Sequence, residues 1–160
     1  MGIDGFKCDG TDPMIALVRP WPYSPYRKRF VTTTEYSHTY YGDFYNYTKQ
    51  KNPEGLIMAR PTDSFQIYNT SYVFLNYAPK YVMFSGWVGD QDSTFDGFRS
   101  AVWNIIHSAW NGYLNFGFDI GGYRSVHNNK LVFIRWAQLG AFVPFMENGG
   151  CGKHQPWQFD

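Results

Sequence analysis

Two hydrophobic periods alternate along the chain and predict short strands separated by amphipathic helices. Compact apolar runs that suit buried strands are found at five places: residues 2–9, 55–59, 81–84, 114–118 and 141–145. Segments with apolar residues at helical spacing lie between most of them. The predicted order is β-α-β-loop-β-α-β-α-β, and strands that alternate with helices in this way indicate parallel βαβ units.

Start and stop signals place the three predicted helices at residues 33–52, 93–112 and 128–140. Each begins at a residue type that caps helix N-termini, the candidates being Thr33 or Thr34, Ser93, and Asn128 or Asn129. The first helix carries four aromatic residues expected on its inner face: Tyr36, Tyr40, Phe44 and Tyr47. Residues 64–80 are a connection rich in Tyr, Asn and Ser, and their pattern leaves its structure uncertain.

Composition narrows the function without identifying it. The chain has 160 residues and a formal net charge of +1. It therefore lacks the strong positive charge that would attract nucleic acid or an anionic membrane surface. No apolar run approaches the roughly 20 residues of a membrane span. Aromatic residues make up 21% of the chain. They suit both a packed core and the stacking of flat ligands such as sugars, and composition does not choose between these.

Acidic residues follow every predicted strand. In parallel α/β folds, chemistry collects beyond the carboxyl ends of the strands. Seven acidic residues lie at such ends: Asp9, Asp12, Asp63, Asp90, Asp92, Asp119 and Glu147. Any one of them could be an ordinary loop or cap residue, but their recurrence after all five strands favours paired-carboxylate chemistry. In that chemistry one carboxylate attacks the anomeric carbon of a sugar, and a protonated one donates to the leaving oxygen.

Other chemistries find less support. The four histidines show no HxH or HxxxH spacing, and Cys8 and Cys151 lie far apart in the chain, which argues against a zinc site. No GxSxG elbow, Walker loop or GxGxxG follows a predicted strand. We therefore expect no metal and no cofactor.

Five segments resemble glycoside hydrolase family 31, in the order that the family shows. GIDGFKCDGTD at 2–12 is similar to its nucleophile strand, and IMARPTD at 57–63 to its Arg-containing strand. FSGWVGDQDSTFDGF at 84–98 is similar to its acid/base segment. LNFGFDIGGY at 114–123 and IRWAQLGAFVPFMEN at 134–148 match its last two strand motifs. Together the segments span nearly the whole chain.

The resemblance implies a (β/α)8 TIM barrel and a retaining mechanism, without a metal, on α-glucosides or related α-glycosides. By position it makes Asp9 the nucleophile and Asp90 the acid/base. It also implies four residues around the sugar: Asp12, Arg60, Trp87 and Asp119. Where the family often has Arg-Asn-His, this chain has Glu147-Asn148-Gly149. His154 is a candidate to occupy the space that this difference leaves.

A complete barrel needs about 250 residues, so residues 1–160 are expected to form a partial barrel of about strands four to eight. The N-terminal βα units and flanking β domains would then be absent, and the fragment would have little activity alone. Two other interpretations stay open: a non-catalytic carbohydrate-binding pseudoenzyme, and an α-glucan lyase. We expect a carbohydrate substrate, no nucleic-acid partner and no membrane span, and the sequence leaves localisation and oligomeric state unknown.

Overall fold

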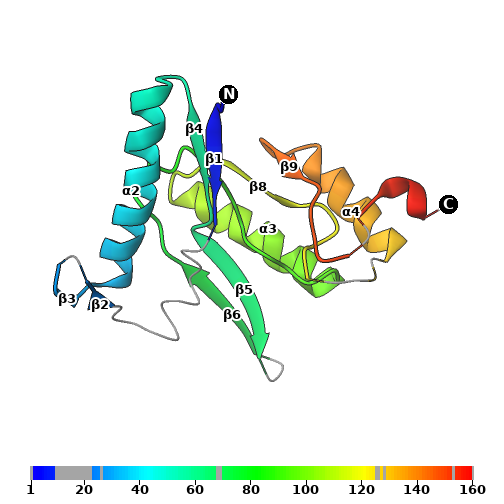
Figure 1. Cartoon of the computed structure of the whole chain (residues 1–160). Coiled ribbons are helices and arrows are strands. Elements are labelled where there is room, and N and C mark those ends of the chain that lie inside the picture. The colour runs from blue at the N-terminus through cyan, green and yellow to red at the C-terminus, as the bar shows by residue number, and fades with distance from the viewer. Residues whose placement is uncertain are drawn as a thin grey trace.

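The computed structural model describes residues 2–9, 23–25, 27–67, 70–124, 127, 129–152 and 154–159. Its centre is a five-stranded sheet in which every neighbouring pair is parallel and the spatial order follows the chain (Figure 1). The strands are β1 (Gly5–Cys8), β4 (Leu56–Ala59), β7 (Ser85–Trp87), β8 (Asn115–Asp119) and β9 (Met146–Glu147). The predicted fold class is confirmed as an open half of a parallel α/β barrel.

Within the described residues, three α-helices and a short 3-10 helix accompany the sheet. They are α2 (Thr33–Lys51), α3 (Phe95–Trp110), α4 (Lys130–Gly140) and η1 (Pro156–Gln158). Helix α2 packs along β1 and β4, and α3 packs against β8 and α4 (Figure 1). Helix α2 therefore packs on the part of the sheet that holds β1 and β4, and α3 on the part that holds β8.

A complete capping box fixes the start of α2. The Thr32 hydroxyl oxygen accepts a hydrogen bond from the Glu35 amide at 3.0 Å, and the Glu35 carboxylate accepts one from the Thr32 amide at 3.0 Å. Arg29 strengthens the arrangement through an ion pair of 2.6 Å with Glu35. The predicted helix is confirmed, and its cap is Thr32, one residue before the first predicted candidate.

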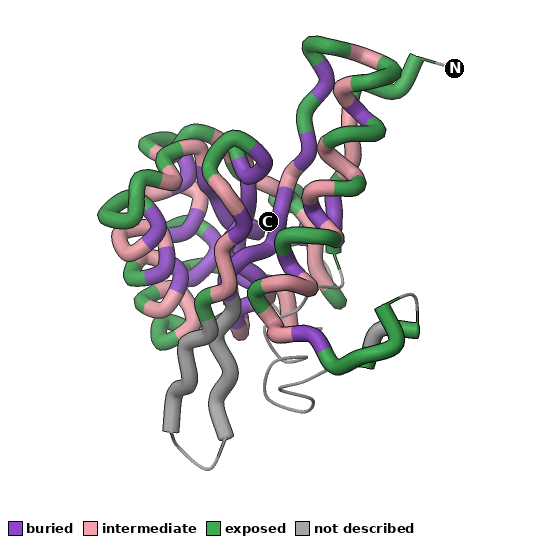
Figure 2. Tube along the Cα trace, turned by 90° about the vertical axis from the view of Figure 1, so that its left-hand side faces the viewer, coloured by how far each residue is buried: buried purple, intermediate pink, exposed green. Residues whose placement is uncertain are grey.

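Two apolar clusters fill the space between the sheet and the helices. Figure 2 shows that the buried positions gather in the interior of the molecule. The first cluster centres on Phe118 and Trp136, the second on Tyr41 and Ile57. Tyr77 borders both clusters and stacks on the Tyr113 ring with centroids 4.3 Å apart. Each cluster is the core under one half of the sheet.

The structure of residues 64–80, which the sequence left uncertain, includes most of a hairpin. Strands β5 (Thr62–Ile67) and β6 (Thr70–Leu75) pair as an antiparallel hairpin, which extends beyond the carboxyl end of β4 (Figure 1). A second small ribbon joins β2 (Tyr23–Ser24) and β3 (Arg29–Phe30). Each of these strands is stabilised by pairing with its neighbour, and the apolar pattern of one strand alone does not reveal that pairing.

The strands predicted at 81–84 and 141–145 were placed wrongly. The amides of Val82 and Met83 both donate to the Pro79 carbonyl at 2.9 and 3.0 Å, so their buried side chains belong to a turn. Strand β7 begins only at Ser85. Near the C-terminus, turns continue beyond α4, and β9 is the pair Met146–Glu147. An apolar run thus marks burial here without marking a strand.

The aromatic row predicted for the inner face of α2 is confirmed in part. Tyr40 and Phe44 are half-buried and pack against the second cluster, whereas Tyr47 is 54% exposed. The fully buried positions of the helix are Ser37, Tyr41 and Thr48, and the Tyr41 hydroxyl bonds to the Arg60 main chain.

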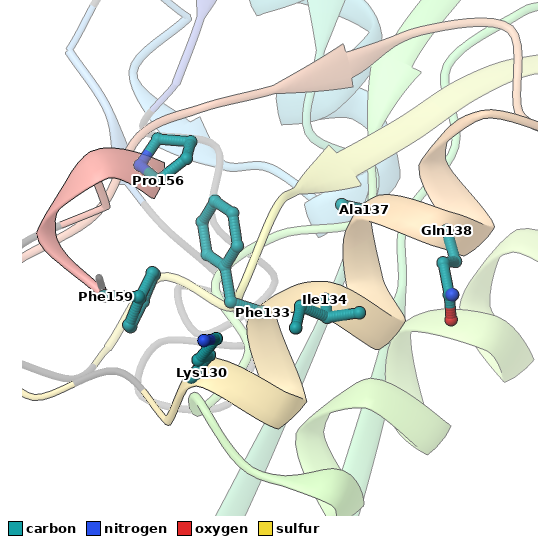
Figure 3. Close-up of a pocket in the computed structure, with 7 residues that line it drawn as sticks. All are labelled: Lys130, Phe133, Ile134, Ala137, Gln138, Pro156 and Phe159. Carbon is teal, nitrogen blue, oxygen red and sulfur yellow. The ribbon is translucent and has the colours of Figure 1, made fainter.

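A surface pocket of about 390 Å³ lies between α4 and η1. Figure 3 shows Phe133 of α4 facing Pro156 and Phe159, and the remaining lining residues also lie along α4. Of the described acidic residues that follow the strands, none lines it. In the part of the chain that the structure describes, no helix is both long and apolar enough to cross a membrane.

Candidate active site at the strand ends

Charged residues mark the carboxyl end of each strand of the parallel sheet. Asp9 follows β1, Arg60 follows β4, and Asp90 comes three residues after β7. Asp119 and Glu147 are the last residues of β8 and β9, where they are register partners. Because the strands are parallel, these side chains share one edge of the sheet.

Arg60 brings the two proposed catalytic carboxylates together. Its Nη1 lies 2.9 Å from Asp9 Oδ1, and its Nη2 lies 3.2 Å from Asp90 Oδ2. The Arg60 side chain is only 5% exposed, whereas that of Asp9 is 57% exposed and that of Asp90 21%. One rigid guanidinium therefore holds both carboxylates while leaving Asp9 open to a ligand.

Two neighbouring tyrosines on α2 hold the main chain behind this arrangement. The buried Tyr41 hydroxyl donates to the Arg60 carbonyl at 2.9 Å and accepts from the Arg60 amide at 3.2 Å. The Tyr40 hydroxyl donates to the Asp9 carbonyl oxygen. The helix thus fixes the ends of β1 and β4, a role that the sequence pattern, which predicted only packing, did not reveal.

Trp87 lies beneath the charged groups. Its side chain is 1% exposed, with Lys7 Nζ 4.2 Å from the ring centroid and Arg60 Cζ 6.0 Å from it. Cations over an indole face are attracted by its quadrupole. The buried ring therefore packs against the cationic groups of Lys7 and Arg60.

Asp119 is the most deeply buried acid of the site, at 1% exposure. Burial is the main cause that raises its pKa from 3.8 to about 8, and the charge of Glu147 adds to the effect. Neither Asp119 oxygen accepts a hydrogen bond from a donor in the described residues. A buried carboxyl group that no donor stabilises favours its protonated form.

The turn after β8 depends on two glycines. Gly121 and Gly122 have φ angles of +87° and +81°, in the left-handed region that glycine adopts without strain. The Gly122 amide donates to the Asp119 carbonyl at 3.1 Å, and a Cβ at this position would lie 2.8 Å from the Asp92 carbonyl oxygen. The tight turn therefore fixes the path of the main chain directly after Asp119.

The predicted site residues fall into three groups. The structure brings five together at one edge of the sheet: Asp9, Arg60, Trp87, Asp90 and Asp119. His154 is buried, and its Nδ1 lies 3.2 Å from the Ile120 carbonyl oxygen, so it attaches the C-terminal loop to the end of β8. Asp12 and the side chain of Asp63 lie outside the described residues.

Lys7 is a charged residue of the site that sequence reasoning missed. It stands two residues before Asp9 in an extended segment, and this period-two spacing puts both side chains on one face. Its Nζ lies 2.6 Å from Glu147 Oε2. Within the described ranges, no group of three or more His, Cys, Asp or Glu side chains is arranged to hold a metal ion.

Comparison with known proteins gives a consistent result. The family model of the glycosyl hydrolases family 31 TIM-barrel domain matches residues 1–160. An isomaltosyltransferase from Sporosarcina globispora is 25% identical over 165 residues, which cover 98% of this chain and 14% of that protein. The chain thus spans about a seventh of the length of this relative.

Two solved structures share the fold. The cycloalternan-forming enzyme from Listeria monocytogenes, in complex with a pentasaccharide substrate, has a TM-score of 0.67 at 21% identity, covering 98% of this chain and 14% of that one. The cycloalternan-degrading enzyme from Trueperella pyogenes, in complex with a covalent intermediate, has a TM-score of 0.64 at 20% identity, covering 98% of this chain and 20% of that one.

Proposed function

The chain belongs to the glycosyl hydrolases family 31 TIM-barrel domain family, and we propose that it forms part of the catalytic barrel of a retaining α-glycosidase. The observation that carries the proposal is the bridge from Arg60 to Asp9 at 2.9 Å and to Asp90 at 3.2 Å. Retaining enzymes hold their two carboxyl groups about 5–5.5 Å apart. Two carboxylates that share one guanidinium are compatible with that spacing.

In the proposed mechanism Asp9 is the nucleophile. Its carboxylate oxygen forms a bond to the anomeric carbon while the bond from that carbon to the leaving oxygen breaks, and Asp90 gives its proton to the leaving oxygen. Water then attacks the anomeric carbon, Asp90 takes the proton of that water, and the ester bond to Asp9 breaks. The free sugar keeps its α configuration, and both carboxyl groups return to their starting states.

Arg60 has different consequences for the two acids. Its ion pair with Asp9 holds that exposed carboxylate in place, which suits a nucleophile. The acid role of Asp90 needs a proton, and Asp90 also pairs with Arg60, at 3.2 Å. A sugar that enters between the two acids would have to separate Asp90 from Arg60 before Asp90 acts as the acid.

The proposed substrates are α-linked glucan oligosaccharides. Support comes from the isomaltosyltransferase and from the pentasaccharide-bound cycloalternan-forming enzyme. The same two similar proteins favour a second candidate activity, in which a sugar hydroxyl replaces water in the second step. Transfer and hydrolysis share the Asp9 intermediate, so they differ only in the acceptor.

Trapping the intermediate tests the proposal. The complete reading frame that carries this chain, and the 160-residue chain beside it, would be incubated with 5-fluoro-α-D-glucosyl fluoride and digested for peptide mass spectrometry. We expect a glycosyl adduct on Asp9 that is lost in Asp9→Asn, with Asp92→Asn as the matched control that keeps it. An adduct on another residue would refute the assignment.

Product analysis separates the alternatives. Release of an α-configured sugar from 4-nitrophenyl α-D-glucoside supports hydrolysis, and longer oligosaccharides support transfer. An anhydro sugar would identify the lyase. Saturable oligosaccharide binding without any adduct or product would identify a non-catalytic binding module.

A further inference from the structure

One ion pair connects the two outer strands of the parallel sheet. Lys7 lies in β1 and Glu147 in β9, and their Nζ and Oε2 atoms are 2.6 Å apart. In a flat sheet the spacing of about 4.8 Å between strands would place these outer strands roughly 19 Å apart. Two side chains cannot span that gap, so the sheet must curve until the side chains of β1 and β9 meet over its concave face.

Each partner also lies against a group of the proposed sugar pocket. Lys7 Nζ sits 4.2 Å from the centroid of Trp87. Glu147 is the register partner of Asp119 on the neighbouring strand. The side chain of Lys7 is 42% exposed and that of Glu147 14%, so the pair borders the open side of the sheet.

We propose that Lys7 and Glu147 are a positioning pair, which holds the sheet curved and fixes Trp87 and Asp119 beside the sugar. This proposal rests on the proposed function, because it assigns these groups to the same pocket. It also gives Glu147 a role, since an arginine at that position would repel Lys7 instead of binding it. The glutamate and the lysine therefore belong together in this chain.

The pair has two opposing effects on Asp119. The carboxylate of Glu147 raises the pKa of Asp119, and the ammonium of Lys7 lowers it. Asp90, beyond β7, acts in the same direction as Glu147. Tyr123, in the turn after β8, also interacts electrostatically with Asp119. Loss of the same ion pair should thus shift this titration in opposite directions, depending on which partner is removed.

Substitutions of the two partners test this reasoning in the full reading frame. Lys7→Met removes the cation, so the titration of Asp119 should move to higher pH. Glu147→Gln removes the anion, so it should move to lower pH. We expect each shift to reach about one pH unit, the size common for neighbouring charges in proteins. Lys7→Arg keeps the cation and should retain the titration of the unmodified protein.

Two measurements follow these variants. Carbon-13 NMR of aspartate-labelled protein follows the carboxyl carbon of Asp119, identified by its loss in Asp119→Asn. The pH profile of kcat/KM with 4-nitrophenyl α-D-glucoside gives the same titration in the reaction. We expect KM to rise at least threefold in both single variants, with a smaller change in kcat. Arg99→Gln, which breaks an exposed ion pair on α3, is the matched control and should change neither.

The outcomes are distinguishable from failure of the proposed function. Shifts of Asp119 in the same direction in both variants, or no shift, would overturn the positioning pair even if Asp9 is still labelled. Opposite shifts with KM unchanged would also overturn it, because the pair would then not act on the sugar. If the unmodified protein has no activity, the catalytic proposal fails, and the NMR titration with the oligosaccharide affinity still decides on the pair.

Discussion

Replacement of Asp119 by asparagine should change how the stability of the protein depends on pH. The carboxyl group is 1% exposed, and burial raises its pKa from 3.8 to about 8. Between these values the unfolded chain has lost the proton, while the folded chain keeps it. The folded state therefore binds more protons than the unfolded state. The contribution of Asp119 to the free energy of unfolding consequently falls as pH rises toward 8. Asparagine has the same shape and no titration.

The magnitude follows from the gap between the two pKa values. Each pH unit corresponds to about 1.4 kcal/mol, so the full contribution of Asp119 is of the order of 5 kcal/mol across the range from pH 4 to pH 8. The charge of Glu147 contributes to the raised pKa of Asp119, so the size of the change depends on this neighbour as well as on burial. We therefore expect a difference of about 2–5 kcal/mol.

Urea unfolding followed by tryptophan fluorescence at several pH values between 4.5 and 9 measures this difference. The free energy of unfolding of the unmodified protein should fall with pH relative to that of Asp119→Asn. Asp96→Asn, at an acid that is 75% exposed on its side chain, is the matched control and should leave the slope unchanged. Parallel pH dependences for the unmodified protein and Asp119→Asn would show that Asp119 ionises normally and would refute the reasoning.

Three further predictions concern the framework of the site. Arg60→Lys keeps a charge but loses the planar fork that bridges two carboxylates, so kcat/KM should fall about 100-fold, measured with an aryl α-glucoside. Tyr41→Phe removes the hydroxyl between the Arg60 amide and carbonyl, which should lower the free energy of unfolding by about 1–3 kcal/mol; an unchanged urea midpoint would contradict this. Thr32→Ala removes the capping box of α2 and should cost about 1 kcal/mol in the same assay while kcat/KM stays constant.

Much of the candidate site could be predicted because strand ends are visible in a sequence. A buried apolar run followed by an acid predicts a side chain at one edge of a parallel sheet, and this reasoning brought Asp9, Asp90 and Asp119 to the same place. The parallel order also followed from strands that alternate with helices. What the pattern left open or misplaced depends on partners far away in the chain: the hairpin of β5 and β6 needs both strands, and the turn at Val82 needs the Pro79 carbonyl.

Lys7 illustrates a limit of predicting a site from the sequence. A lysine within a short strand ordinarily indicates a solvent-facing position, yet its spacing of two residues from Asp9 already places both on one face of β1. What the sequence could not show is the curvature of the sheet, which lets Lys7 reach Glu147 across the strands between them. A positive charge two residues before a proposed nucleophile and a negative charge at the end of the last strand are unrelated in one dimension. Curvature brings the two side chains together, with Lys7 Nζ 2.6 Å from Glu147 Oε2.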